Sequence, residues 1–123
     1  MAFTSTKSVT LTYHHGVESD ATATVIENIT GGAATVYAIS IDNDANGAAV
    51  SFVRFWDAKT ATNGTDAPYM SLKADADEKN ITYVMPQGLK FSTGISFASV
   101  TNHGGTAGTS SPSGDVVVRI VYS

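Results

Sequence analysis

Residues 35–56 read TVYAISIDNDANGAAVSFVRFW, two strand-like runs on either side of the polar stretch DNDANG at residues 42–47. In the first run we expect Tyr37, Ile39 and Ile41 to share one face, and in the second run apolar residues occupy both faces. This alternation has the two-residue period of a β-strand, whereas an α-helix repeats every 3.6 residues. We therefore expect two strands joined by a tight turn, with DNDANG as a hairpin tip.

The stretch DNDANG also begins like a calcium-binding loop, because Asp42, Asp44 and Asn46 alternate and a glycine follows. An EF-hand needs a Glu at its twelfth position to hold the ion with both oxygens, but the twelfth residue from Asp42 is Val53. A turn accounts for every residue, since Asp and Asn bond their own backbone and Gly47 tolerates positive φ. The sequence therefore predicts no metal and no cofactor. One alternative stays open, a looser calcium site that another loop completes. Its ligands would be Asp42, Asp44 and Asn46.

Outward from this stretch, the chain has the composition of strands. Val and Ile together number 19, whereas Leu numbers 3, and β-branched side chains suit pleated strands. Gly, Asn, Asp or Pro separate eight candidate strands: 8–13, 21–29, 35–41, 49–56, 69–74, 81–85, 95–101 and 115–122. We therefore predict an all-β fold, an antiparallel β-sandwich that is an eight-stranded jelly roll or a related Greek-key fold. Residues 8–123 are expected to form this single domain.

The N-terminal residues 1–12 are polar and rich in Thr and Ser, and they include the apolar residue Phe3. They predict a flexible arm, which either orders on a partner or is a frayed terminus.

Charge and composition exclude several functions. The net charge of the chain is −4 and its basic residues are scattered, whereas binding to nucleic acid needs clustered Lys and Arg. There are no cysteines, so disulfides and thiolate metal sites are excluded. No stretch approaches the roughly 20 apolar residues of a membrane helix. We expect neither nucleic acid nor membrane as a partner.

No set of residues has the spacing of a catalytic site. His14 and His15 lie near Glu18 and Asp20, but neighbouring residues of a strand point to opposite faces. The acidic stretch at 75–78 looks like an exposed turn, whereas glycosidase carboxylates face each other across a sugar. No serine lies in a G-x-S-x-G elbow. The sequence therefore predicts that the protein is not an enzyme.

Two of the predicted strands, 49–56 and 115–122, are apolar on both faces. One face fills the sandwich, and the other needs a cover, either loops of the same chain or another subunit. The candidates for a subunit interface are Phe3, Phe52, Trp56, Val117, Val121 and Tyr122. The alternative is a carbohydrate-binding platform made of Trp56, Tyr69, Tyr83 and Tyr122, because jelly rolls include lectins.

The segments VYAISIDNDANGAAVSFVRFWDA, APYMSLKADADEKNITYVMPQGLKFSTGISFASVT, GTAGTSSP and VVVRIVY resemble small, cysteine-free structural proteins of tailed bacteriophages. Within that class the chain is most similar to capsid decoration (cement) proteins. The resemblance implies a virion protein that is made in the bacterial host cytoplasm and binds the major capsid protein on the outside of the shell. It also implies a homo-oligomer, with a trimer favoured, and it assigns no residue a role. The alternative function is a tail module or a module that binds carbohydrate on the host surface.

Overall fold

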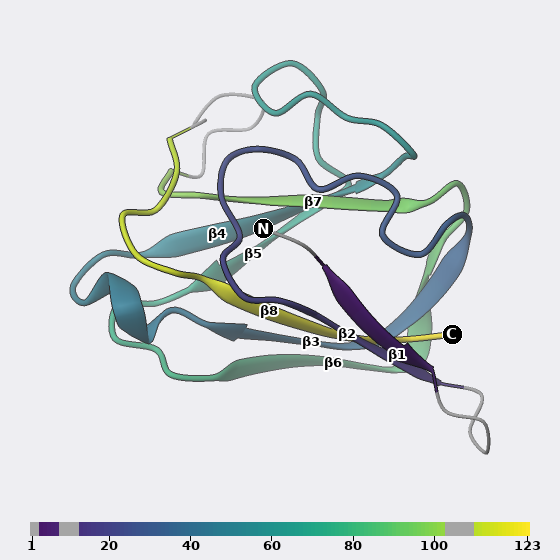
Figure 1. Cartoon of the computed structure of the whole chain (residues 1–123), viewed down its shortest axis with the longest axis horizontal. Helices are drawn as coiled ribbons and strands as arrows, with labels where there is room; N and C mark the ends of the chain where they lie inside the picture. The colour runs from purple at the N-terminus through teal and green to yellow at the C-terminus, as the bar shows by residue number, and fades with distance from the viewer. Residues whose placement is uncertain (1–2, 8–12, 103–109) are drawn as a thin grey trace.

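The computed structural model of the chain describes residues 3–7, 13–102 and 110–123. Its strands are β1 (Thr4–Lys7), β2 (His14–Glu18), β3 (Ala34–Asp42), β4 (Ser51–Asp57), β5 (Met70–Ala74), β6 (Ile81–Phe91), β7 (Ile95–Val100) and β8 (Val117–Tyr122), with one 3-10 turn, η1 (Asp44–Asn46). A five-stranded sheet of order β1-β2-β8-β3-β6 packs against a three-stranded sheet of order β5-β4-β7 (Figure 1). The predicted antiparallel β-sandwich is confirmed. Among the described residues no helix is long or apolar enough to cross a membrane.

The strand pairs are nested in the order of the chain. The connection between β4 and β5 is innermost, β3 pairs with β6 around it, and β2 pairs with β8 outside that. Between these last two pairs, Ile26 forms a bridge with Phe97 of β7. Ile29 also contacts β7, because its N–H donates to the carbonyl of Ile95 in that strand. Nested pairs of this kind describe one long hairpin folded over itself, which is the double Greek key of a jelly roll.

The core lies between the two sheets, where apolar side chains of both inner faces meet. It includes Val36, Ile39, Ile41, Val118 and Ile120 from the larger sheet and Val53, Phe55, Ile95 and Phe97 from the smaller sheet, all fully buried. The rings of Phe55 and Phe97 stack with their centroids 5.6 Å apart. Burial of each such side chain stabilises the fold by about 1.5–3 kcal/mol, so this layer holds the sheets together without a disulfide.

The expected strand at 21–29 is only partly correct. This segment runs beside β7, but its ladder is reduced to the bridge at Ile26. Asn28 adopts a φ of 50°, a left-handed conformation that cannot continue an extended strand. The structure also contains β2 (His14–Glu18), which pairs with β8 and lies outside the eight predicted strands.

The described part of the predicted N-terminal arm is a strand. Residues Thr4–Lys7 form β1, the edge strand that pairs with β2, and Phe3 packs against the core. The predicted strand at 8–13 lies outside the described residues, except for Tyr13.

The strand that is predicted to stop at Pro86 continues as far as Phe91. Proline removes a backbone donor and is therefore tolerated on an edge strand, and β6 lies at the edge of the five-stranded sheet. The ladder with β3 is also irregular there, because Val36 pairs with Leu89 and Ala38 with Val84.

The turn at 42–47 joins β3 to β4, which belong to different sheets. It is therefore a corner between the two layers of the sandwich, and the predicted hairpin tip is wrong. The change of sheet explains why this turn has buried side chains, Asn43 and Asn46.

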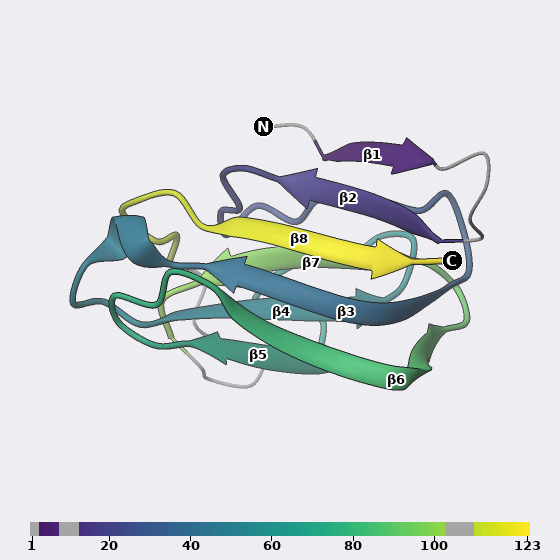
Figure 2. The same ribbon diagram turned by 90° about the horizontal axis from the view of Figure 1, so that it is seen from below.

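The outer face of the three-stranded sheet is covered by the chain itself. Trp56, which is 2% exposed, forms a second apolar cluster with Ala61 and Ala98, and Val25 and Ala58 pack against it. Figure 1 shows the loop between β4 and β5 lying over this sheet. The outer face of the five-stranded sheet differs, since no described segment crosses it in Figure 2.

The side chain of Arg54 holds together the segments that cover the outer face of the three-stranded sheet. Its side chain is fully buried, and its guanidinium donates to Oδ1 of Asn63 at 3.0 Å and to the carbonyl of Asn102 at 3.4 Å. Burial lowers the pKa of the Arg54 guanidinium from its ordinary value. Asn63 in turn donates to the carbonyl of Ala23 at 3.0 Å, so one buried cation links three covering segments.

Candidate functional site

The side chain of Asn43 organises the corner at 42–47. It is fully buried, and its Nδ2 donates to the carbonyls of Ala49, Ala74 and Asp75 at 2.9–3.4 Å. Its Oδ1 accepts hydrogen bonds from Ser51 and Asn46 at 2.7 and 2.8 Å. Asn43 therefore connects the start of β4 to the end of β5, and its role is structural.

Hydrogen bonds within the chain engage two of the three candidate calcium ligands, Asp42 and Asn46. The Asp42 carboxylate accepts the N–H of Asp44 at 3.0 Å, which is the local bond of an Asx turn. Asn46 is 8% exposed, and its Oδ1 accepts the N–H of Gly114 at 2.7 Å. Gly47 has a φ of 53°, which suits glycine at the end of the turn. Among the described residues, no group of three His, Cys, Asp or Glu side chains is placed to hold a metal ion.

The histidines and carboxylates of 14–20 are also separated. The His14 ring lies against the Tyr122 ring with centroids 5.3 Å apart, whereas His15 is exposed on the other face of β2. Glu18 is fully buried and accepts the N–H of Asp20 at 3.1 Å. Because β2 directs His14 and His15 to opposite faces, the two histidine rings do not face one common site.

Two of the interface candidates are covered by this chain, and we correct their assignment. Trp56 and Tyr122 are 2% and 5% exposed. The Tyr122 hydroxyl shares a hydrogen bond with the Ser5 hydroxyl at 2.6 Å. Buried side chains offer no surface to another subunit. The predicted carbohydrate platform also loses two of its four rings, those of Trp56 and Tyr122.

The other interface candidates lie in three places. Phe3 packs edge-on against Phe97 with centroids 6.1 Å apart. Phe52 is partly exposed on the outer face of the three-stranded sheet. Val117 and Val121 are partly exposed on the outer face of the five-stranded sheet, because their neighbours Val118 and Ile120 point into the core.

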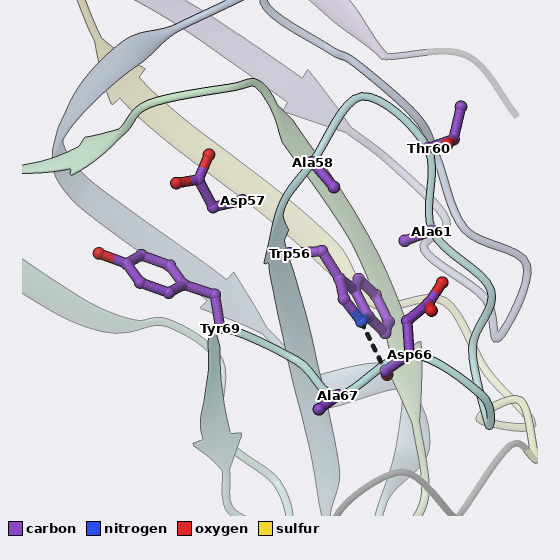
Figure 3. Close-up of a pocket in the computed structure, with 8 residues that line it drawn as sticks. All are labelled: Trp56, Asp57, Ala58, Thr60, Ala61, Asp66, Ala67 and Tyr69. Atoms are coloured by element: carbon purple, nitrogen blue, oxygen red, sulfur yellow. Dashed lines mark hydrogen bonds between the residues drawn. The ribbon is translucent and has the colours of Figure 1, made fainter.

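A shallow pocket of about 430 Å³ lies beside the Trp56 cluster. Its lining consists of Trp56, Asp57, Ala58, Thr60, Ala61, Asp66, Ala67 and Tyr69. Figure 3 shows the indole N–H of Trp56 donating to the Asp66 carbonyl, at 3.0 Å, while the Tyr69 ring extends away from the indole. Tyr69 is 50% exposed, so it is the one ring of the predicted platform with a broad open surface.

The Asp57 carboxylate, which lines this pocket, accepts hydrogen bonds from the backbone. It accepts the N–H groups of Ser92, Thr93 and Gly94 at 3.0, 2.8 and 3.4 Å. Burial would raise the pKa of Asp57, but these three hydrogen bonds outweigh that effect, so its pKa lies below its ordinary value. Asp57 therefore holds the turn between β6 and β7.

The outer face of the five-stranded sheet, here called the open face, is crossed by no described segment in Figure 2. Its two central rows of cross-strand neighbours are His15–Val121–Ala38–Val84 and Val17–Arg119–Ser40–Thr82. Val84 is 64% exposed. At one end Tyr13, 46% exposed, meets Tyr37 edge-on at 5.0 Å. The open face thus presents aliphatic and aromatic side chains around one arginine.

Only part of the open face is predicted by the sequence. Val117 and Val121 are among the interface candidates because strand 115–122 is apolar on both faces. Arg119 lies between them in the same alternation, so the pattern contains it, but a single charged residue in an apolar strand carries no signal of its own. Tyr13, Tyr37 and Val84 come from other strands, and their proximity depends on a strand order that one sequence does not give.

Comparisons with protein families, with curated proteins and with solved structures found no significant match for this chain.

Proposed function

We propose that this chain is a non-enzymatic structural protein of a bacteriophage virion, a capsid decoration protein that binds the outside of the shell and stabilises it. The observation that carries the proposal is the unequal cover of the two sheets. The chain seals the outer face of the three-stranded sheet over Trp56, while the described residues leave the open face bare. Apolar surface left bare beside a sealed core is typical of a protein that functions by association.

The fold and the resemblance to phage structural proteins support the same proposal. Jelly rolls occur in viral capsid proteins and in lectins, and the nested pairing of the strands is typical of that architecture. The acidic and histidine side chains at 14–20, at 42–46 and at Asp57 lie apart or in structural hydrogen bonds, so binding is favoured over chemistry. By resemblance, the partner is the major capsid protein, and the assembled form is a homo-oligomer, with a trimer favoured.

The test is binding to capsids of the phage that encodes the chain. Purified protein is mixed with expanded capsids that lack it, and bound and free protein are separated by sedimentation. The proposal predicts saturable binding with a fixed number of copies per capsid and a higher temperature of capsid disruption. Immunogold labelling confined to tails, or absence of the protein from virions, would contradict it.

A second candidate function, carbohydrate binding on the host surface, is favoured by one observation. The exposed Tyr69 ring lies at a pocket of about 430 Å³, within the usual size range of small-ligand sites. A glycan array with the wild-type protein and with Tyr69→Ala tests it. Binding that Tyr69→Ala abolishes would support this candidate, and an array without binding would exclude it.

A further inference from the structure

The N-terminal strand β1 lies at the outer edge of the five-stranded sheet, where it pairs with β2 (Figure 2). The Phe3 ring, just before the strand, packs over Gly16. The hydroxyl of Ser5 shares a hydrogen bond of 2.6 Å with the hydroxyl of Tyr122. Residues 3–7 make all of these contacts, so this short segment can leave its place and return to it as one unit.

The surface that receives β1 is a strand edge with a recess for one aromatic ring. Gly16 in β2 has no side chain, and a Cβ atom there would overlap the Phe3 ring. Phe97 also lines the recess, because its ring meets Phe3 edge-on with the centroids 6.1 Å apart. Proteins bind extended segments in this way, with backbone pairing along a strand edge and pockets for single side chains. The edge of β2 therefore has the form of a binding site, and residues 3–7 fit it.

The sequence between β1 and β2 does not favour a hairpin. Lys7 pairs with His14, so the connection consists of residues 8–13, SVTLTY. Hairpin connections are usually about two to five residues long and carry Gly, Asn, Asp or Pro. This connection contains none of these four residue types, and its Val, Thr and Tyr are typical of strands. Its residue types favour an extended path, which leads β1 away from the β2 of its own chain.

Exchange of β1 between copies removes this conflict without needing a new contact. The backbone pairing, the Phe3 recess and the Tyr122 hydroxyl are the same in every copy, so residues 3–7 fit a neighbouring copy as well as their own. Six extended residues span about 20 Å, which is enough to reach an adjacent copy. Exchange of an identical element is a low-cost route to a homo-oligomer, because the contacts already exist in the single chain.

We infer that β1 is exchanged between copies of this chain. Residues 3–7 of one copy pair with β2 of the next copy, and Phe3 enters the recess over that copy's Gly16. Each copy gives one strand and receives one, so the assembly closes as a pair or as a ring. The exchange goes beyond the proposed function and does not depend on it, since it involves neither a capsid nor the open face.

Engineered disulfides distinguish an exchanged strand from one that stays in its own chain. The chain has no cysteine, so Thr4→Cys with Val17→Cys introduces one pair of thiols, at directly opposite positions of β1 and β2. Opposite Cα atoms of an antiparallel pair lie about 4.5–5.5 Å apart, within reach of a disulfide. Ser40→Cys with Thr82→Cys is the matched control, because it joins β3 to β6 within the sandwich. Thermal denaturation first shows that both variants are folded.

After oxidation, a non-reducing gel separates linked copies from single chains. Exchange predicts that most of the Thr4→Cys, Val17→Cys protein runs as linked copies, whereas the control runs as a single chain. When isotope-labelled and unlabelled chains are refolded together and oxidised, disulfide-linked peptides should join a labelled copy to an unlabelled one. A disulfide between positions 4 and 17 that is confined to single chains would overturn the exchange. Absence of that disulfide would also overturn it, because β1 would then not lie beside β2.

A second variant tests the connection between the strands. Thr10→Asn with Leu11→Gly supplies the two residues of a tight hairpin turn and so favours pairing of β1 with its own β2. Analytical ultracentrifugation should find the wild type as an oligomer and this variant as a single chain. A monomeric wild type would contradict the exchange. An oligomer that the turn residues leave unchanged would contradict it too, because the copies would then be joined elsewhere.

Discussion

At the scale of single residues, the corner at 42–47 depends on an asparagine amide that faces inward. Asn43 satisfies three carbonyls and two side-chain donors at once. Replacing it with alanine leaves several of these buried groups without a partner, and each such group costs about 1–3 kcal/mol. We therefore expect Asn43→Ala to lower the free energy of unfolding by about 2–4 kcal/mol, measured by urea denaturation.

Asp44→Ala is the matched control for that prediction, because Asp44 is an exposed residue of the same turn. It should change the free energy of unfolding by less than about 0.5 kcal/mol. Equal effects of the two substitutions would show that the buried amide is not what holds the corner.

The same corner shows what the sequence predicts at this scale and what it does not. The types of residue, Asp, Asn and Gly, correctly predict a turn, since they make local backbone bonds and allow positive φ. They do not distinguish the inward Asn43 from the calcium-like positions on either side of it. That distinction arises from the contact of the corner with β5, a segment about 30 residues further along the chain.

At the scale of elements, the turn between β6 and β7 depends on the ionised Asp57. A carboxylate whose pKa is lower in the folded chain than in the unfolded chain stabilises the fold above its unfolded pKa, about 3.9. This stabilisation is lost as the pH falls through the folded value. Asp57→Asn resembles the protonated form, so we expect it to be less stable than the wild type near pH 7 and equally stable in strong acid.

Thermal denaturation between pH 2 and pH 7 measures this difference. Asp44→Asn, which removes the same charge from an exposed turn, controls for the general effect of net charge. A stability difference between Asp57→Asn and the wild type that does not shrink in acid would contradict the role given to the ionised carboxylate.

A second element-scale prediction concerns β1, which is held by the fit of Phe3 over Gly16. A Cβ atom at Gly16 would overlap the Phe3 ring, so Gly16→Ala must displace the ring. We expect faster amide exchange in Thr4–Lys7 and a loss of about 1–3 kcal/mol in the free energy of unfolding, as for other overpacked sites. Hydrogen exchange measures the first effect and urea denaturation the second.

Phe3→Ala should produce the same faster exchange in β1, and adding Gly16→Ala to it should cost little more, because the clash is then absent. Unchanged exchange in β1 on Gly16→Ala would mean that Phe3 does not anchor this strand.

The prediction of elements is most accurate where apolar alternation is long and uninterrupted. The strands β3, β4, β7 and β8 lie within two residues of their predicted ends. The segment at 21–29 has similar alternation, but Asn28 adopts a left-handed conformation that its residue type permits without requiring. Pro86 predicts that the strand ends there, but β6 continues. A strand tolerates a proline when it lies at the edge of a sheet, and the position of β6 in the sheet cannot be read from the segment itself.

At the scale of the whole molecule, the two apolar outer faces that the sequence predicts are covered differently. Loops cover the three-stranded sheet, and the described residues leave the five-stranded sheet open. This asymmetry is the basis of the proposed role as a decoration protein.

The most direct measurement of that role is an electron-microscopy map of the intact virion at a resolution that separates the two sheets. The proposed role predicts a two-layered β-domain on the outside of the shell, with β2, β8, β3 and β6 against the capsid subunits and the loop over Trp56 turned to solvent. Density for the protein on the tail would contradict the proposed role, and density on the shell with the three-stranded sheet against the capsid would contradict the assignment of the open face as the binding surface.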